Sequence, residues 1–567
     1  MSQGTRVSES SPFGRESDIA RSFVLGSIIV SVFCLGYIAR HRLGVTDSYS
    51  VSIFWHLLIE QDYWAALLIF GLFAVALLAR DAAPTLAVVR ALARHPNIVA
   101  VVAFVAFSAG AVLVYHDYPL SMDEYSARFQ SEVFAAGQLT GRYPGELLDW
   151  LIPTPFQNMF LIVSRPTGEV ISYFMPGFSL LLTPFTVLGI PWACNPAIGA
   201  LSLVAIQRLA REIGASEEAG GWAVIFALAS PAFSINAMSY YSMSANLLFS
   251  VVYTLLLIRP APGKALAAGL IGGFALVMHS PPPHMLYAAP WIVWLIMRRE
   301  FRCLVALAVG YLPFAVGLGI GWLHLIGDLR SAGATHAAAS SATTSGPYIW
   351  SWLAAIGRIV GLPDPSTIMV RIGGLVKLWV WAVPGLPLLA WFGFQCGRTD
   401  PRYRLLLASA VTTFLGYCLI PFDQGHGWGY RYFHTAWGIL AVLAAAAMVR
   451  APGDASDRRR FIALVGALAL GSLLFSTALR VVQVNAFIGR HLDQVPLADV
   501  HKAQVAFIDT DHGYYTIDMV QNDPRLNRKG LIMASHGPKE NAEMARRLSP
   551  VAQQISAGVW GELWLLE

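Results

Sequence analysis

Charged side chains are scarce in this sequence of 567 residues. Asp, Glu, Lys and Arg make up only 13% of it, whereas hydrophobic residues make up 56% and the mean hydropathy is +0.55. An ordinary soluble chain contains about 25% charged residues. The composition therefore excludes an ordinary soluble enzyme and indicates that lipid surrounds most of the chain.

Cysteine is also sparse. The five cysteines are odd in number and scattered, and most lie in or beside apolar runs, so they predict neither a disulfide framework nor a metal cluster. The net charge of +5 comes with arginines at the ends of apolar runs, where membrane topology alone explains them. Nothing here indicates a nucleic-acid partner.

Apolar runs of the length that a bilayer core of about 30 Å requires of a helix recur along the chain. They predict thirteen spans, at residues 22–38, 63–79, 98–115, 193–207, 219–236, 241–258, 265–280, 283–297, 303–325, 374–394, 405–421, 433–449 and 461–479. A fourteenth run, residues 173–190, has Pro176, Pro184 and Pro191 in or beside it, which would break a spanning helix. We expect it to be a re-entrant segment or to lie on the membrane surface.

The charges of the loops predict the orientation. With residues 173–190 not crossing, one set of downstream loops holds fourteen cations: Arg208, Arg211, Arg259, Lys264, Arg298, Arg299, Arg302, Arg398, Arg402, Arg404, Arg450, Arg458, Arg459 and Arg460. The opposite set holds four: Arg330, Arg358, Arg371 and Arg431. Because positive loops stay inside, the first set is predicted to be cytoplasmic, the N-terminus cytoplasmic and the C-terminus outside.

Three regions are expected along the chain. Residues 1–97 would be anchor helices, residues 98–480 a membrane core with an external loop at 116–192, and residues 481–567 a small α/β domain. In the last region, strands are predicted at 504–510, 530–535 and 558–566, and a helix at 540–548. Asp509 and Asp511 in this domain are expected to cap turns.

Two adjacent carboxylates, Asp123 and Glu124, open an amphipathic stretch in the first external loop. A carboxylate held just above the bilayer can take a proton from an incoming hydroxyl group. The alternative is structural, because Ser121 and Glu124 have the spacing of a capping box. Neighbouring helical positions diverge by about 100°, so the two acids should not share one role.

Further polar groups lie on the same predicted side. His279 and His284 flank a Pro-rich turn, where zinc is conceivable but a structural role is the commoner outcome. The Gly-rich segment 423–434 contains His426, Tyr430 and Arg431, which either contact a ligand or form an interfacial aromatic belt. Lys377, the only lysine inside a predicted span, either binds a ligand or extends its side chain to the interface.

The order of these motifs resembles bacterial GT-C glycosyltransferases, the class that includes protein O-mannosyltransferases and lipid A glycosyltransferases. The resemblance rests on residues 123–137 (DEYSARFQSEVFAAG), 173–177 (YFMPG), 195–196 (NP), 208–211 (RLAR) and 427–432 (GWGYRY). Two motifs depart from the family pattern. Ser172 stands where relatives often carry Lys, and His279-Ser280-Pro281 stands where they often have an Arg-Pro turn.

The resemblance implies an all-α polytopic fold with a small α/β domain in the periplasm of a bacterial inner membrane protein. It also implies a hexosyl- or pentosyltransferase that takes a sugar from a polyprenyl phosphate donor. Asp123 would be the general base, with Glu124 the neighbouring candidate, and Tyr173, His279, His284, Lys377, His426, Tyr430 and Arg431 would contact substrates. The acceptor would be a glycan, lipid or protein, and the reaction would invert the anomeric centre. No residue pattern requires a metal, although a divalent cation remains compatible.

A transporter or flippase for lipids or glycans is the alternative from another class. Transporters usually have repeated halves and polar or broken helices at the middle of the membrane. This sequence shows no internal repeat, and its polar clusters gather on one external face. That distribution favours chemistry at the membrane surface over a path through it.

Overall fold

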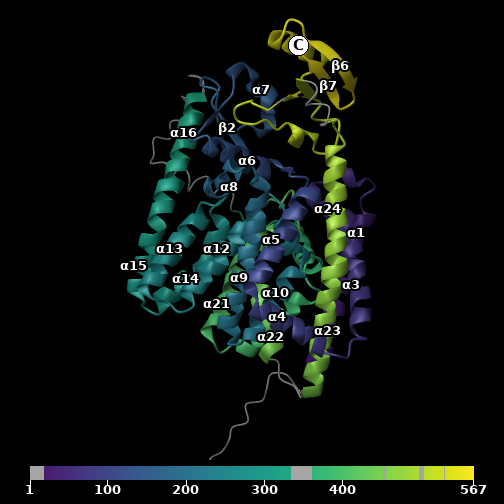
Figure 1. Cartoon of the computed structure of the whole chain (residues 1–567), viewed down its shortest axis with the longest axis vertical. Helices are drawn as coiled ribbons and strands as arrows, with labels where there is room; N and C mark the ends of the chain where they lie inside the picture. The colour runs from purple at the N-terminus through teal and green to yellow at the C-terminus, as the bar shows by residue number, and fades with distance from the viewer. Residues whose placement is uncertain (1–17, 334–360, 451–454, 497–503, 529, 567) are drawn as a thin grey trace, which may run out of the picture.

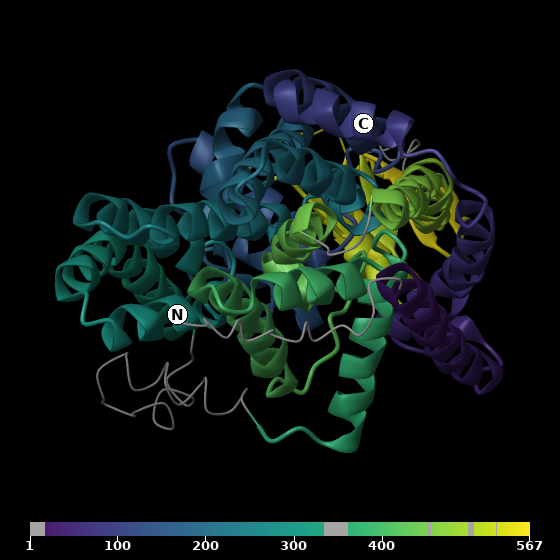
Figure 2. The same cartoon turned by 90° about the horizontal axis from the view of Figure 1, so that it is seen from below.

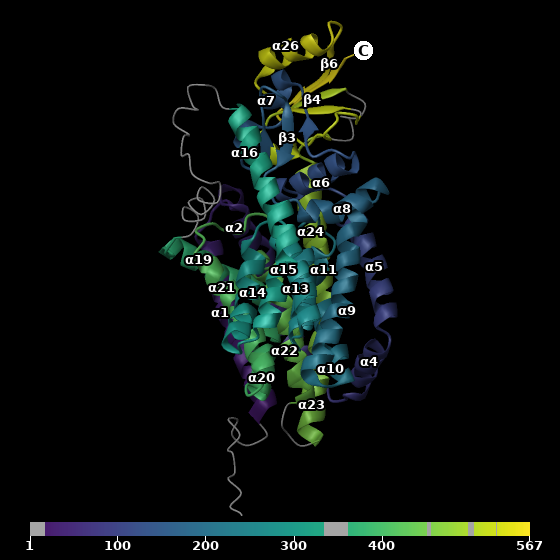
Figure 3. The same cartoon turned by 90° about the vertical axis from the view of Figure 1, so that its left-hand side faces the viewer.

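The computed structural model describes residues 18–333, 361–450, 455–496, 504–528 and 530–566; Arg358, counted above, lies outside them. The molecule is elongated, with a helix bundle at one end and the C-terminal strands at the other (Figure 1). The elements between α5 and α9 lie between these two parts, as the side view also shows (Figure 3). This middle layer is where the polar motifs of the sequence meet.

Within the described residues, seven helical stretches are long and apolar enough to cross a membrane: Ile19–Leu43, Ile53–Ala76, Pro96–Leu113, Pro191–Gly214, Phe301–Ser331, Arg431–Arg450 and Ala455–Leu492. Shorter apolar helices accompany them at Gly177–Val187, Met243–Leu257, Pro262–Leu276 and Leu386–Gly397. The expected all-α polytopic class is confirmed. The count of thirteen spans stays a prediction.

The bundle is built from nineteen of the described α-helices. They are α1 (Asp18–Leu43), α2 (Ile53–Leu57), α3 (Tyr63–Ala76), α4 (Ala83–Arg94), α5 (Pro96–Leu113), α9 (Cys194–Gly214), α10 (Glu217–Leu228), α11 (Pro231–Asn236), α12 (Met243–Leu257), α13 (Pro262–Leu276), α14 (Pro282–Met297), α15 (Phe301–Leu312), α16 (Gly321–Gly333), α19 (Pro365–Val380), α20 (Leu386–Gly397), α21 (Pro401–Cys418), α22 (His434–Arg450), α23 (Ala455–Gly471) and α24 (Thr477–Leu492). Viewed from below, the helices of residues 260–330 and the N-terminal helix lie on opposite sides of the bundle (Figure 2).

Helix α5 shows how the bundle divides its surface between lipid and protein. Val101, Val102 and Val105 are exposed, at the spacing that puts them on one helical face, whereas Ala103 and Phe107 are buried. Helix α22 is different, because every residue from His434 to Met448 is buried. A helix that is apolar all round belongs at the centre of a bundle, and α22 lies there.

The first loop forms a layer on top of the bundle. It contains α6 (Met122–Ala135), β1 (Gly141–Arg142), α7 (Leu148–Leu151), β2 (Leu161–Val163), β3 (Glu169–Ser172) and α8 (Gly177–Val187). The three strands form an antiparallel sheet in the order β1-β3-β2. Helix α8 has 11 residues and so spans about 16 Å, too short to cross a bilayer core of about 30 Å. Residues 173–190 therefore do not form a spanning helix, as predicted.

The C-terminal domain, residues 504–566, is a four-stranded sheet in the order β5-β4-β7-β6 with one helix. Its elements are β4 (Val505–Ile508), β5 (Leu531–Ala534), α26 (Pro538–Leu548), β6 (Gln553–Gly558) and β7 (Gly561–Leu565). Strand β4 pairs parallel with β5 and antiparallel with β7. The three predicted strands and the helix are confirmed, while β6 was not predicted.

The C-terminal domain and the first loop share one hydrophobic core. Phe129 of α6 and Leu148 of α7 belong to the same buried cluster as Phe507 of β4 and Met533 of β5. Trp150 contacts Phe507 edge to face, with ring centroids 5.5 Å apart. The two parts therefore form one packed unit on the bundle.

Candidate active site

Asp123 and Arg431 meet where the first loop rests on the bundle. Asp123 is the second residue of α6, and its carboxylate forms an ion pair with the Arg431 guanidinium, which comes from the Gly-rich segment 308 residues later. Arg431 Nη1 also donates to the carbonyl oxygens of Gln424 and His426, at 3.1 and 2.9 Å. The guanidinium lies 4.6 Å from the centre of the Tyr241 ring. Arg431 is thus held on three sides.

The segment that carries Arg431 folds around its own arginine. Gln424 accepts a hydrogen bond from the Arg431 backbone N–H at 2.8 Å and donates to the Gly429 carbonyl at 2.9 Å. Gly425, Gly427 and Gly429 have φ values of 61°, 143° and 69°, which L side chains rarely adopt. These glycines let the backbone of the segment wrap around Arg431.

Asp123 keeps some contact with the surroundings, since 19% of its side chain is exposed. Burial raises the pKa of Asp123, but the positive charge of Arg431 lowers it below its usual value. The carboxylate is therefore ionised at neutral pH and able to accept a proton.

Glu124 faces the other way and is fully buried. Its oxygens accept hydrogen bonds from the Tyr115 hydroxyl at 3.0 Å and from the backbone N–H groups of Leu120 and Tyr240 at 2.9 and 2.8 Å. Burial raises the pKa of Glu124 to about 8, although these donors favour the ionised form. The capping-box interpretation is not confirmed, because Ser121 caps no backbone group and contacts Tyr241 instead.

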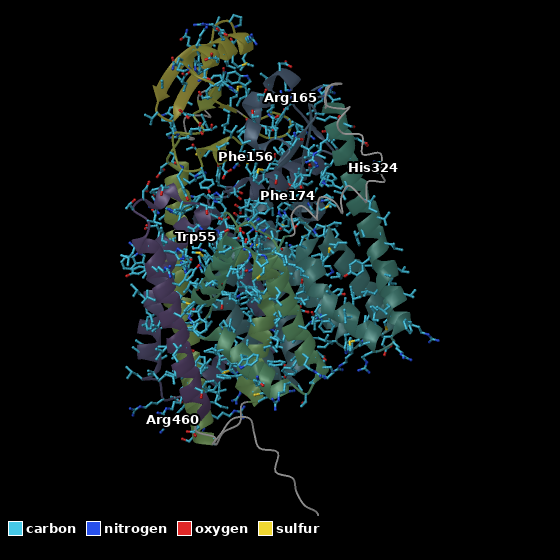
Figure 4. All side chains as sticks on the ribbon, turned by 180° about the vertical axis from the view of Figure 1, so that it is seen from behind. Trp55, Phe156, Arg165, Phe174, His324 and Arg460 are labelled. Carbon is cyan, nitrogen blue, oxygen red and sulfur yellow. The ribbon has the colours of Figure 1, made fainter. Side chains whose placement is uncertain are left out.

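His279 reaches the site through a backbone pairing between two predicted motifs. Met175 N–H donates to the His279 carbonyl at 3.0 Å, and Gly177 N–H donates to the Val277 carbonyl at 2.8 Å. The His279 ring stacks on Phe174 with centroids 3.9 Å apart. Phe174 lies where the first loop meets the bundle (Figure 4). Burial lowers the pKa of His279 to about 4, so its ring is neutral at pH 7.

The structure distributes the other predicted residues unevenly. His426 lies beside Arg431, whereas His284 contacts the Tyr311 hydroxyl at 2.6 Å inside the bundle. Tyr430 stacks on Phe433, and Lys377 pairs with Asp62 at 2.8 Å in a separate buried cluster. Tyr173 is 40% exposed, with the Arg330 guanidinium 5.6 Å from its ring. Asp123, Arg431, His279 and His426 thus form the centre of the candidate site.

Metal binding has no ready-made ligand set here. Among the described residues, no group of three or more His, Cys, Asp or Glu side chains is arranged to hold a metal ion. His279 and His284, the two predicted zinc candidates, have different partners, Phe174 and Tyr311.

Three residues around the site were not predicted. Gln424 lies inside the Gly-rich segment, so its polar side chain beside Arg431 was a usable signal. Tyr241, at the start of an apolar run, and Asp518, in the C-terminal domain, gave none. Asp518 Oδ2 lies 3.3 Å from His426 Nε2.

Comparison with known proteins gives a likeness in structure alone. No protein-family model and no curated protein matches the sequence. Two solved structures of ArnT from Cupriavidus metallidurans share the fold. The one bound to undecaprenyl phosphate has a TM-score of 0.50 and 13% identity over 79% of this chain and 88% of ArnT. The apo structure has a TM-score of 0.51 and 13% identity over 82% and 97%. The expected GT-C-like fold is confirmed.

Proposed function

We propose that this protein is an inverting glycosyltransferase that moves a sugar from a polyprenyl phosphate carrier to a hydroxyl group of a glycan, lipid or protein acceptor. The observation that carries the proposal is the Asp123–Arg431 ion pair, a carboxylate beside a guanidinium where the first loop rests on the helix bundle. The fold supports it, because one ArnT structure of this fold is bound to undecaprenyl phosphate. The transferred sugar is a hexose or a pentose.

The reaction follows from the charges of the pair. The acceptor oxygen attacks the anomeric carbon while the bond from that carbon to the phosphate oxygen breaks, and the bonding electrons leave with the polyprenyl phosphate. Asp123 takes the acceptor proton, because its carboxylate is ionised. Arg431 stabilises the negative charge that develops on the departing phosphate. Neutral His279 donates a hydrogen bond to the same phosphate, where relatives often carry Arg.

The membrane orientation is part of the proposal. The cations of the predicted cytoplasmic loops, Arg460 among them, would lie in the cytoplasm, with the first loop and the C-terminal domain in the periplasm of the inner membrane. Figure 4 supports it, because Arg460 and Arg165 of the first loop lie at opposite ends of the molecule. Substrates would then reach Asp123 from the outer leaflet.

Transfer from a radiolabelled polyprenyl phosphate sugar pool tests the proposal, with purified protein in proteoliposomes and a lipid and glycan acceptor fraction. We expect wild type to move label to the acceptor and Arg431→Gln to be slower by about 100-fold, the typical cost of one charge-stabilising group. Without Arg431, burial of Asp123 raises its pKa, so the acid limb of the residual activity should move to higher pH. Arg165→Gln, which removes an arginine that is 51% exposed on the first loop, is the control.

The transporter alternative gives a different result in the same vesicles. If the labelled carrier changes leaflets in a protein-dependent way and no label reaches an acceptor, the protein is a flippase. Equal transfer by wild type and Arg431→Gln, with both folded, would remove Arg431 from the mechanism.

Gly177 is expected to be essential for the placement of His279. A Cβ atom at residue 177 would lie 2.6 Å from the Val277 carbonyl oxygen and 2.9 Å from its carbon, so the two backbones would have to separate. Because a 1 Å misplacement can cost about 100-fold in rate, we expect Gly177→Ala to reduce transfer at least about tenfold. Gly321→Ala is the control, since its Cβ would meet nothing within 4 Å. Full activity of Gly177→Ala would mean that this pairing does not matter for catalysis.

A further inference from the structure

Asp518 of the C-terminal domain is buried beside the proposed active site. Its side chain is only 6% exposed, and its Oδ2 lies 3.3 Å from Nε2 of His426, whose side chain is 9% exposed. Buried polar groups are costly when they are left unpaired. The His426 ring at this ion-pairing distance belongs to the segment that holds Arg431.

His426 contacts both Asp518, through its ring, and Arg431, through its backbone. Its backbone carbonyl accepts a hydrogen bond from Arg431 Nη1 at 2.9 Å, and Arg431 in turn pairs with Asp123. The imidazole packs edge to face on Tyr515 of the C-terminal domain, with centroids 4.7 Å apart. The His426 ring therefore contacts two side chains of the C-terminal domain, Asp518 and Tyr515, while the carbonyl of the same residue contacts Arg431.

The segment around Asp518 is itself attached to the loop that carries Asp123. Gln521 Nε2 donates to the Pro119 carbonyl at 2.8 Å, four residues before Asp123. The Asn522 N–H donates to the Tyr125 hydroxyl at 2.9 Å, two residues after it. One short stretch of the C-terminal domain thus contacts both segments that supply the Asp123–Arg431 pair.

We propose that Asp518 is a positioning residue of the active site, through which the C-terminal domain sets the position of His426 and Arg431 relative to Asp123. This inference rests on the proposed function. Asp518 touches no reacting atom; it fixes the His426 ring, and the His426 carbonyl then fixes the guanidinium. The C-terminal domain is accordingly part of the catalytic unit.

Two variants of one domain make a matched comparison. Asp518→Asn keeps the shape of the side chain and replaces one carboxylate oxygen with an NH₂ group. Asp509→Asn changes an exposed turn residue whose carboxylate accepts the backbone N–H of Asp511 at 3.0 Å. Hydrogen exchange of residues 423–431 is measured first, because it needs no activity. We expect exchange there to become about tenfold faster in Asp518→Asn and to stay unchanged in Asp509→Asn.

Transfer kinetics separate positioning from a general loss of stability. We expect Asp518→Asn to lower kcat about tenfold with little change in the KM for acceptor, and Asp518→Glu to recover part of the loss. In a double-mutant cycle, Asp518→Asn should cost nothing further once His426 is replaced by alanine, because the contact is already gone.

Each result supports or overturns the inference. Unchanged exchange in residues 423–431 overturns it, even if wild type proves to transfer no sugar. Where wild type is active, full kcat in Asp518→Asn or additive losses in the cycle also overturn it. If the proposed function is wrong, wild type will transfer no sugar. The exchange of residues 423–431 will still show whether Asp518 holds that segment in place.

Discussion

Replacing Asp123 with asparagine is expected to lower sugar transfer by about 100- to 10,000-fold, the range that a general base contributes. Asparagine keeps the size of the side chain and can still accept a hydrogen bond from Arg431, but it cannot take the acceptor proton. The loss should fall on kcat, since the base acts in the transition state. Initial rates with radiolabelled donor, at saturating acceptor, measure it.

Glu124→Gln decides which of the two adjacent carboxylates is the base. Both carboxylate oxygens of Glu124 accept hydrogen bonds. A glutamine has only one oxygen, so its NH₂ group must face a group that is itself a donor. We expect this variant to be less stable to heat yet to keep far more activity per folded molecule than Asp123→Asn. The opposite order of activities would make Glu124 the base. Asp149→Asn, which changes a partly exposed acid paired with Arg165, is the control.

The two residues of the pair could be selected singly from the sequence, because a carboxylate at a helix start and an arginine among glycines are unusual between apolar runs; their catalytic roles stay a proposal. Asp123 and Arg431 were both predicted on that ground. Their pairing was not, since nothing in a sequence of this length indicates that residues 308 positions apart meet. The same limit applies to Asp518, which lies in a segment without any distinctive pattern.

The fold was predictable where the sequence has distinct apolar segments and not elsewhere. The long apolar runs gave the polytopic class, and β4 and β7 are largely buried and apolar. Strand β6 is exposed along its whole length and reads QQISAG, so no alternation of polar and apolar residues marks it. Its partner is β7, with which it pairs antiparallel.

Lys377 shows how a correct signal can point to a different role. It was predicted as a ligand-binding cation or one that reaches the interface, because an isolated charge inside a span is costly. In the structure Asp62 pairs with Lys377 at 2.8 Å and with Arg480 at 2.7 Å, and it accepts a hydrogen bond from the Trp381 indole N–H at 2.7 Å. None of these charged side chains is more than 1% exposed. The charge of Lys377 is thus paired inside the bundle.

Asp62→Asn should therefore destabilise the protein by about 3–5 kcal/mol, the usual cost of leaving buried charges without their partner. Two cations would remain in the bundle with no counter-charge among the side chains that contact them. Thermal unfolding in detergent measures the loss. Asp149→Asn breaks an exposed ion pair and should cost about 0–1 kcal/mol, so equal melting of the two variants would contradict the prediction.

Activity should fall together with stability, because the cluster also touches the segment that holds Arg431. Trp381 packs on Trp428 with ring centroids 6.2 Å apart, and the Trp428 indole donates to Tyr115, which in turn donates to Glu124. A triple variant with leucine at Asp62 and methionine at both Lys377 and Arg480 has none of the three charges. It should regain much of the stability. If the cluster only supports the bundle, this triple variant will also regain transfer. A stable triple variant without activity would show that the charges themselves act on the site.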